Sequence, residues 1–258
     1  MAKKIAVTNQ KGGVGKTTTT VNLSACLAEQ GMRVLVLDVD PQGNATSGLG
    51  VDKFEVPYSV YDLLVNSVAA TDALVHTATP NLDVIPSNIE LAGAEVEMVS
   101  MLGREFVLQR ALEPIADQYD FMLIDCPPSL GLLTVNAMAA ADSVMVPIQC
   151  EYYALEGLSQ LMNTVKLVKK HINPKIEVEG VVLTMYDART KLSAQVVEEV
   201  RKFFRDKVYR SVIPRNVRLG EAPSHGLPIH LYDPKCSGAE AYQALAREIL
   251  AANGGTQA

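Results

Sequence analysis

The sequence predicts a single α/β domain in which a mostly parallel, doubly wound sheet carries helices on both faces. Short apolar segments alternate along the chain with longer segments whose apolar residues recur at three- and four-residue steps. A glycine-rich turn joins the first apolar segment to the first helical one, and no linker rich in Pro, Gly or Ser divides the chain. With 258 residues, 48% of them apolar, the chain is long enough for one large core.

The first three predicted elements form a strand-helix-strand unit. Residues 4–9 are a short buried strand, and a helix follows from about residue 16 to residue 30, where Gly31 ends it. Residues 33–38 form a second apolar strand directly afterwards. Two strands connected through a helix lie parallel in one sheet, because the helix carries the chain back to the end of the sheet where the first strand began.

The remaining elements continue the alternation. Further strands are expected at residues 82–85, 121–124, 143–147, 178–184 and 208–213. One helix face is marked by Leu158, Leu161, Met162, Val165 and Val168. The last helix, residues 238–250, has an apolar stripe of Tyr242, Leu245 and Ile249 that is expected to pack on the core. We therefore expect a domain over residues 1–252 and a flexible tail over residues 253–258.

Cysteine content and hydropathy exclude several classes of protein. Cys26, Cys126, Cys150 and Cys236 are widely spaced, so neither a disulfide framework nor a zinc or iron-sulfur site is indicated. Only six residues separate Lys4 from Lys11, which is too short for a signal-peptide core, and no segment reaches the roughly 18 to 20 apolar residues that span a bilayer. We expect a cytoplasmic protein without membrane attachment.

Residues 10–18 have the composition of a phosphate-binding loop. Glycines between the strand and the helix let successive backbone N–H groups surround phosphate oxygens, and the helix N-terminus adds positive potential. Lys16 is expected to contact the β- and γ-phosphates, and the hydroxyl of Thr17 to bind Mg²⁺. The contacts to the nucleotide are expected from Lys11, Gly12, Gly13, Val14, Gly15, Lys16, Thr17 and Thr18. Gln10 stands where the usual pattern has glycine.

Carboxylates follow two of the predicted strands. Asp38 and Asp40 come at the end of the second strand, and Asp125 ends the apolar segment that begins at Phe121. The carboxyl ends of parallel strands meet at the sheet edge where ligands bind. Asp125 resembles a Walker B acid, which holds Mg²⁺ directly or through water. An acid at a strand end is weak evidence alone, but the loop at residues 10–18 strengthens it.

The motifs together resemble the chromosomal ParA (Soj-type) partitioning ATPases over essentially the whole chain. The resemblance is carried by the deviant Walker A loop at residues 11–17, by Asp-Val-Asp-Pro-Gln-Gly-Asn-Ala-Thr at residues 38–46 and by Asp-Cys-Pro-Pro-Ser at residues 125–129. Residues 151–157 and 212–218 also match the family, although the first of these motifs has no chemical role that its spacing reveals. The N-terminal DNA-reading domain of larger plasmid members is not expected here.

The resemblance implies catalytic roles for Lys11, Lys16, Asp40 and Asp125, with ATP and Mg²⁺ as cofactors. Lys11 is the signature lysine that reaches the phosphates of the other subunit in an ATP-bridged homodimer. Asp40 positions or activates the attacking water, and Thr17, Asp40 and Asp125 surround the metal ion. Pro214 and Asn216 are expected to contact adenine. The simpler alternatives are a solvated loop lysine at residue 11 and a turn cap at residue 40.

Basic residues concentrate in one part of an otherwise acidic chain. The formal net charge is −6, yet residues 166–218 hold thirteen Lys or Arg and six Asp or Glu. The resemblance implies double-stranded DNA, bound without sequence preference, and a ParB-type partner that stimulates hydrolysis at the nucleoid. The candidate DNA-binding residues are Arg189 and Arg218, followed by Arg201, Lys202 and Arg205 on a helix whose opposite face carries Val196, Val200 and Phe203. An ordinary solvated helix face is the alternative.

Three other functions share parts of this pattern. A membrane-associating switch similar to MinD would need a basic amphipathic terminal helix, whereas residues 238–250 contain one basic residue, Arg247. An electron-transfer or cluster-scaffold ATPase would need cysteines placed to bind an iron-sulfur cluster. A regulator that binds ATP without hydrolysing it is disfavoured by Asp40 and Asp125. The sequence therefore favours an ATP-dependent partitioning switch.

Overall fold

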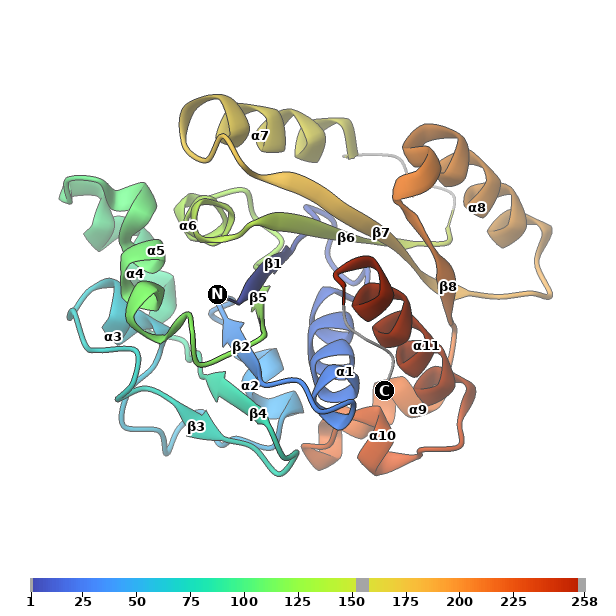
Figure 1. The fold of residues 1–258 in the computed structure, drawn as a ribbon, viewed down its shortest axis with the longest axis horizontal. Coiled ribbons are helices and arrows are strands. Elements are labelled where there is room, and N and C mark those ends of the chain that lie inside the picture. The colour runs from blue at the N-terminus through green and yellow to red at the C-terminus, as the bar shows by residue number, and fades with distance from the viewer. Residues whose placement is uncertain (1, 152–157, 255–258) are drawn as a thin grey trace.

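The computed structural model describes residues 2–151 and 158–254 and contains one central sheet (Figure 1). Its strand order is β3-β4-β2-β5-β1-β6-β7-β8, and every neighbouring pair is parallel except β3 with β4. The strands are β1 (Lys3–Val7), β2 (Val34–Asp38), β3 (Val75–His76), β4 (Leu82–Ile85), β5 (Phe121–Asp125), β6 (Ser143–Gln149), β7 (Glu177–Tyr186) and β8 (Val208–Pro214).

Helices connect the parallel strands. They are α1 (Lys16–Glu29), α2 (Asn44–Gly48), α3 (Val60–Leu64), α4 (Leu91–Glu97), α5 (Val107–Leu112), α6 (Leu132–Ala140), α7 (Leu158–His171), α8 (Lys191–Phe204), α9 (Val217–Glu221), α10 (Ile229–Tyr232) and α11 (Ser237–Ala252). Short 3-10 turns lie at Met98–Ser100 (η1), Arg104–Phe106 (η2), Glu113–Ile115 (η3), Arg205–Lys207 (η4) and Ala222–His225 (η5).

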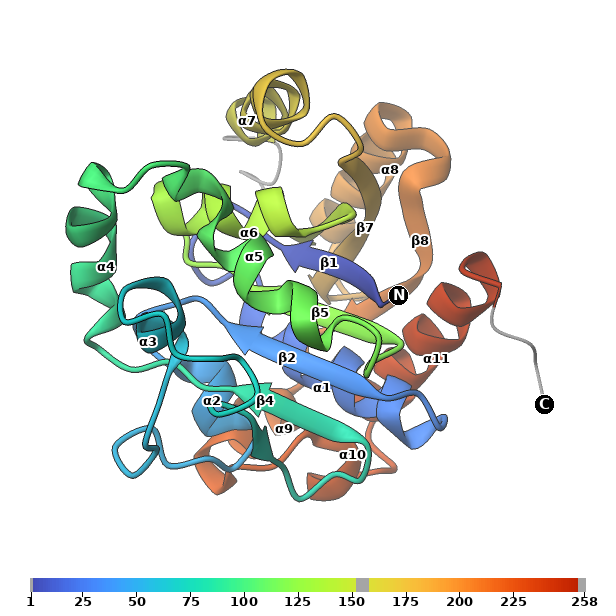
Figure 2. The ribbon, with the colours of Figure 1, turned by 60° about the vertical axis from the view of Figure 1, so that its left-hand side comes forward.

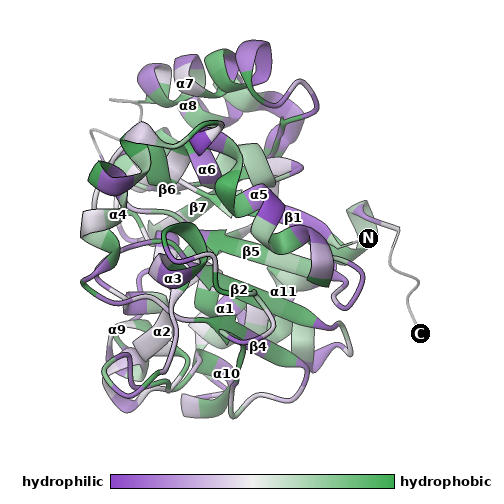
Figure 3. Cartoon of the chain, turned by 90° about the vertical axis from the view of Figure 1, so that its left-hand side faces the viewer, coloured by the Kyte–Doolittle hydropathy of each residue, from purple (hydrophilic) through white to green (hydrophobic). Residues whose placement is uncertain are grey.

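Both faces of the sheet are buried. In β2, Val34 and Val36 belong to the apolar cluster under α1 and α11, whereas Leu35 and Leu37 belong to the cluster under α3 to α6. This alternation is what a strand covered on both faces requires, because successive side chains point to opposite sides. A third cluster lies under α7 and α8. Figure 3 shows the hydrophobic colour concentrated in the central strands. The predicted fold class is confirmed.

The sheet has a topological switch point beside β1, which lies between β5 and β6. The chain leaves β1 through α1 on one face and leaves β5 through α6 on the opposite face. Because these two connections diverge, the carboxyl ends of β1 and β5 are left open at one edge. Figure 2 shows this edge from the side, with α4 beyond the arrowheads of β2 and β4. The crevice contains the candidate site.

The sequence predicted seven strands near their observed positions and missed β3, a two-residue strand too short to show alternation. The interpretation of Phe203 was wrong. That side chain is 58% exposed, and Phe204 is buried in its place. The buried face of α8 runs through Ser193, Val196, Val200 and Phe204 at three- and four-residue steps, which leaves Phe203 at its margin.

The end of the described chain is anchored. Helix α11 ends at Ala252, and the side-chain Nδ2 of Asn253 donates to Oε1 of Glu179 at 3.1 Å. Of the predicted tail at residues 253–258, residues 255–258 lie outside the described part of the structure. Tyr242, Leu245 and Ile249 of α11 are buried as expected. Within residues 2–151 and 158–254, none of the helices has the length and apolar content that crossing a bilayer requires.

Candidate functional site

The phosphate loop needs glycine at two of its positions. Gly13 and Gly15 have φ angles of 71° and 88°, in the left-handed region that favours glycine. Gln10 is not among the residues with positive φ, so a side chain is tolerated at the position where the usual pattern has glycine. The loop ends at Lys16, the first residue of α1, whose first N–H groups have no partner inside the helix. The departure at Gln10 therefore leaves the loop geometry intact.

Neighbouring strands hold the loop in place. Asn9 donates its side-chain N–H to the carbonyl oxygen of Pro147 at 2.7 Å, and its Oδ1 accepts from the amide of Lys11 at 3.0 Å. The hydroxyl of Thr184 on β7 donates to the carbonyl oxygen of Val14 at 2.8 Å. Sequence reasoning missed Thr184, because nothing within residues 178–184 indicates a contact with a loop so distant in the chain.

Lys16 is buried at the centre of the loop, with an exposed fraction of 7%. Its Nζ donates to the carbonyl oxygen of Lys11 at 3.2 Å. Burial lowers the pKa of Lys16, and the negative charge of Asp125 opposes this change. Lys11 itself is half-buried and forms no ion pair among the described residues. The structure thus places one lysine inside the loop and a second at its surface.

Asp125 lies directly behind the loop. Its two carboxylate oxygens accept from the hydroxyls of Thr17 at 2.7 Å and Thr20 at 3.0 Å. Asp125 pairs in register with Asp38 of β2, and both carboxyl groups are fully buried. Burial, together with the charge of Asp38, raises the pKa of Asp125, and the two hydroxyl donors counteract this increase. A cation near these acids would favour their ionised forms.

Asp38 fixes the loop that carries Asp40. Its Oδ2 accepts from the amide and the hydroxyl of Thr46, at 2.8 and 2.7 Å. Asp40 is 8% exposed and its Oδ1 accepts from the amide of Gln42 at 3.0 Å. The sequence placed Asp38 at the site edge but assigned it no role, whereas the structure makes it an anchor for the loop after β2.

A cleft of about 650 Å³ opens over these groups. Its lining contains Gly12, Gly13, Gly15, Lys16, Thr17, Thr18, Asp40, Pro41, Gln42, Asn44, Ile89, Ala92, Pro128 and Met185. The oxygen donors of Thr17, Asp40 and Asp125 are the kind that Mg²⁺ prefers. Among the described residues, no group of three or more His, Cys, Asp or Glu side chains could hold a metal ion. Mg²⁺ in nucleotide sites usually binds one or two protein oxygen ligands and takes its other ligands from phosphate and water.

A second pocket of about 190 Å³ adjoins the cleft and shares Gly15, Thr18 and Met185 with it. Pro214 and Asn216, the predicted adenine contacts, line this pocket. The Asn216 side chain is also engaged within the chain, since its Oδ1 caps α9 by accepting from the amide of Arg218 at 2.8 Å. The predicted phosphate contacts therefore line the cleft, and the predicted adenine contacts line the pocket beside it.

The five predicted DNA-binding residues lie at separate places. Arg189, before α8, is paired with Asp187, and Arg218 on α9 is paired with Glu221 and Asp233. Lys202, near the end of α8, is paired with Glu198 and Glu199. Arg201 shares the last turn of α8, and Arg205 follows it in η4 with a φ of 52°. Arg189 therefore lies at the carboxyl edge of the sheet, whereas Arg201, Lys202 and Arg205 lie at the opposite end of α8.

The family motif at residues 151–157 is described only at Glu151. Its carboxylate pairs with Arg215 at 2.8 Å, and Arg215 lines the second pocket. Residues 152–157 lie outside the described part of the chain. Glu151 is thus connected with the rim of the predicted base pocket, a role that its position in the sequence does not indicate.

A parallel sheet with a glycine loop between β1 and α1, a buried acid at the end of β5 and a cleft above both defines a P-loop nucleotide hydrolase. Comparison with known proteins narrows this class. Residues 2–178 match the model of a family described as an AAA domain. The sporulation initiation inhibitor protein Soj of Bacillus subtilis is 65% identical over 254 residues, which cover 98% of this chain and 100% of that protein.

A second relative and a solved structure also match nearly the whole chain. The chromosome partitioning protein ParA of Myxococcus xanthus is 54% identical over 95% of this chain and 87% of its own length. A solved structure named cobyrinic acid a,c-diamide synthase, from Mycobacterium smegmatis with ADP and magnesium, has a TM-score of 0.87 and 39% identity, covering 99% of this chain and 97% of that one. The chain belongs to the ParA/Soj-type partitioning ATPases. It is an ATPase that uses ATP and Mg²⁺.

Proposed function

We propose that this partitioning ATPase is a switch whose DNA affinity depends on its nucleotide. Mg-ATP drives a sandwich homodimer, the dimer binds nucleoid DNA without sequence preference, and a ParB-type partner stimulates hydrolysis and so releases it. One observation supports this most directly: Lys16 is enclosed by the phosphate loop, whereas Lys11 stands at the loop surface without a carboxylate partner among the described residues. A second copy carrying ATP would supply the missing anion.

The proposed roles of the two loop lysines follow from how deeply each is buried. Lys16 would hold the β- and γ-phosphates of its own subunit, and Lys11 those of the other. Mg²⁺, when bound near Thr17, Asp40 and Asp125, would neutralise charge that develops on the transferred phosphoryl group. Asp40 is at the cleft surface, so its carboxylate is available to orient a water molecule beside the γ-phosphate. Pro214 and Asn216 would contact the base.

Dimerisation also explains how an acidic chain binds DNA. The net charge of one chain is −6, and the basic residues of a single subunit form small separate groups. Joining two subunits doubles each group, and two linked weak contacts bind more tightly than either alone. Tighter binding of ATP to the dimer than to the monomer would shift the equilibrium toward the dimer, and hydrolysis would reverse it.

We expect double-stranded DNA binding only with ATP or a slowly hydrolysed ATP analogue, and not with ADP or without nucleotide. The affinity should fall as salt increases, because phosphate contacts release bound counterions. Fluorescence anisotropy with labelled DNA, at two salt concentrations in the four nucleotide conditions, measures both effects. Absence of DNA binding in every condition, by a protein that still binds ATP, would contradict the proposal.

Arg189→Glu is expected to abolish DNA binding and to leave basal ATP hydrolysis unchanged. The Arg189 side chain is 86% exposed and forms an ion pair with Asp187, so the reversed charge would face both Asp187 and the DNA backbone. Arg201→Glu at the far end of α8 serves as the matched control and should have a smaller effect. Retained DNA binding by Arg189→Glu would show that the contact surface lies elsewhere.

A further inference from the structure

Residues 89–102, which contain α4 and η1, expose an apolar stripe to solvent, called here the α4–η1 stripe. Val96, Val99 and Leu102 are 76%, 59% and 97% exposed, and they follow one another at three-residue steps. Ile89 continues the stripe at its other end and is 64% exposed. The opposite face of the same segment, with Leu91, Ala94 and Met98, is fully buried. Apolar residues gathered on an outer face in this way mark interaction surfaces more often than isolated exposed ones.

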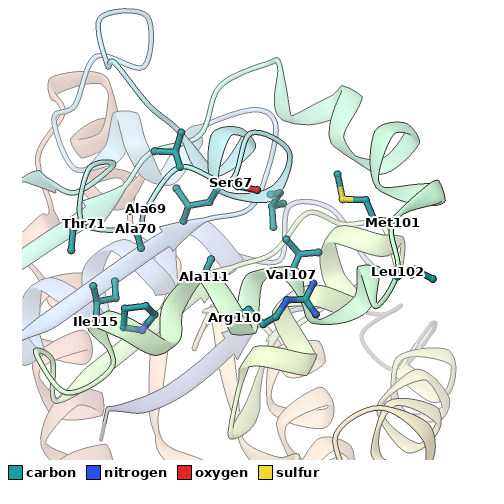
Figure 4. Close-up of a pocket in the computed structure, with 14 residues that line it drawn as sticks. Ser67, Ala69, Ala70, Thr71, Met101, Leu102, Val107, Arg110, Ala111 and Ile115 are labelled. Carbon is teal, nitrogen blue, oxygen red and sulfur yellow. The ribbon is translucent and has the colours of Figure 1, made fainter.

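The stripe connects two hollows in the surface. At one end, Ile89 and Ala92 line the phosphate cleft. At the other end, Met101 and Leu102 line a separate pocket of about 410 Å³ between α5 and the loop after α3. Figure 4 shows this pocket, with Val107, Arg110, Ala111 and Ile115 of the α5 region along one side and residues 67–71 opposite. The stripe and the pocket form one extended surface that begins at the phosphate cleft.

The segment that carries this surface is acidic. Residues 88–117 contain six Asp or Glu and two Arg. Glu90, which precedes α4, and Glu97, at its end, are exposed, and one of the two arginines, Arg104, is paired with Glu105. An apolar stripe with an acidic border is complementary to a segment that presents apolar side chains together with Lys or Arg. Nucleic acid and anionic lipid would be repelled by the same border.

Helix α4 is also joined to the loop that follows Asp125. The Glu95 side chain accepts from the amide of Leu133, in the first turn of α6, at 3.2 Å. Gly131 lies so close to the Glu95 carboxylate that a Cβ atom there would clash with it. Pro128, in the same loop, lines the phosphate cleft with Ile89 and Ala92. A displacement of α4 would therefore be transmitted to residues 126–131 beside the γ-phosphate position.

We infer that the α4–η1 stripe and its adjoining pocket are the docking surface for the partner that stimulates hydrolysis, and that the partner contacts it with a basic segment carrying apolar residues. This inference rests on the proposed function and adds the contact surface and its chemistry. The docked segment acts on hydrolysis through α4, because Glu95 holds the start of α6 and the loop after Asp125. Glu95 is a positioning residue, since it reaches the site only through that loop.

The first test is the double substitution Val99→Ser with Leu102→Ser. ATP turnover is measured with increasing amounts of the ParB-type protein of the same organism, in the presence of DNA. Basal turnover, ATP-dependent dimerisation and DNA binding should match the wild type, whereas the partner concentration for half-maximal stimulation should rise about tenfold or more. Leu167→Ser, which removes a 59% exposed leucine from α7, is the control and should change nothing.

Three outcomes would contradict the inference, and they are distinguishable. Stimulation of the double variant at wild-type partner concentrations would overturn the docking surface alone. Loss of ATP-dependent dimerisation in that variant would assign the stripe to contact between two copies of this chain instead. A wild-type protein that the partner does not stimulate would overturn the proposed function, and the inference with it.

The coupling through Glu95 has its own test. Glu95→Gln keeps an oxygen that accepts from the Leu133 amide, whereas Glu95→Ala removes it. Biolayer interferometry should show both variants binding the partner as the wild type does, while stimulated turnover falls severalfold in Glu95→Ala and is retained in Glu95→Gln. Equal stimulation of all three proteins would overturn the positioning role.

Discussion

Lys16→Ala is expected to reduce ATP affinity on the order of 10²–10³-fold and to abolish ATP-dependent DNA binding with it. Lys16 is the buried cation of the loop. Its Nζ donates to the carbonyl oxygen of Lys11, inside the loop that is expected to surround the phosphate oxygens. Without it, the charge of the triphosphate would face Asp40 and Asp125 with no lysine inside the loop. Equilibrium titration with a fluorescent ATP analogue measures the loss.

This variant needs a folding control, because removing Lys16 also removes a positive charge that interacts with the buried carboxylates of Asp125 and Asp40. Thermal unfolding followed by circular dichroism shows whether the variant still folds cooperatively. Lys169→Ala, at the exposed end of α7, removes a lysine far from the loop and should bind ATP normally. ATP affinity near the wild-type value in Lys16→Ala would show that the loop does not hold the phosphates in the proposed manner.

Asp40→Ala should slow ATP hydrolysis about 10²–10⁴-fold while ATP still binds, because the group that orients the attacking water is missing. The expected product is an ATP-bound dimer that stays on DNA. Single-turnover hydrolysis and the dissociation rate from labelled DNA, measured on the same sample, report the two effects separately. The dissociation rate should fall along with the rate of hydrolysis.

Asp40→Asn separates chemistry from loop structure. The Asn side chain keeps an oxygen that can accept from the amide of Gln42, as Asp40 does at 3.0 Å, but it is a poor base. Asp40→Asn should therefore be slow as well, whereas Asp72→Ala, in an exposed turn, should hydrolyse ATP normally. Hydrolysis at the wild-type rate in either Asp40 variant would contradict the catalytic assignment.

The sequence was informative where the determining signals are local. The glycine loop, the apolar strands and the acids at their ends occupy consecutive residues, so their order alone indicates a parallel sheet with a phosphate site at its carboxyl edge. Asp125 could be placed behind the loop before its contact with Thr17 was known, since parallel strands bring their ends together. Gln10 departs from the usual glycine pattern without disturbing the loop. The pattern alone does not show this, because it does not distinguish the loop positions that need positive φ from those that do not.

Other parts of the site depend on contacts between distant segments. Thr184 holds the loop across 170 positions of the chain, and Glu95 reaches α6 across 38. No periodicity or spacing records such a pair. The charge count at residues 166–218 indicated a basic segment, but it did not show that Arg189, Lys202 and Arg218 are each paired with carboxylates of the same chain. Phe203 was misplaced because the centre of a helical stripe depends on the surface it packs against.

The two halves of the nucleotide site come from opposite ends of the chain. The phosphate loop lies within the first twenty residues, whereas the pocket beside it is lined by Ile213, Pro214, Asn216 and Tyr242. The hydroxyls of Thr19 on α1 and Tyr242 on α11 lie 3.2 Å apart, and the amide of Ile229 donates to Asn22 at 2.7 Å. During synthesis on the ribosome, the phosphate loop emerges first, and these residues of the adjoining pocket follow only when most of the chain has been made. A prematurely terminated chain that ends before Ile213 would lack these four residues of the predicted base pocket.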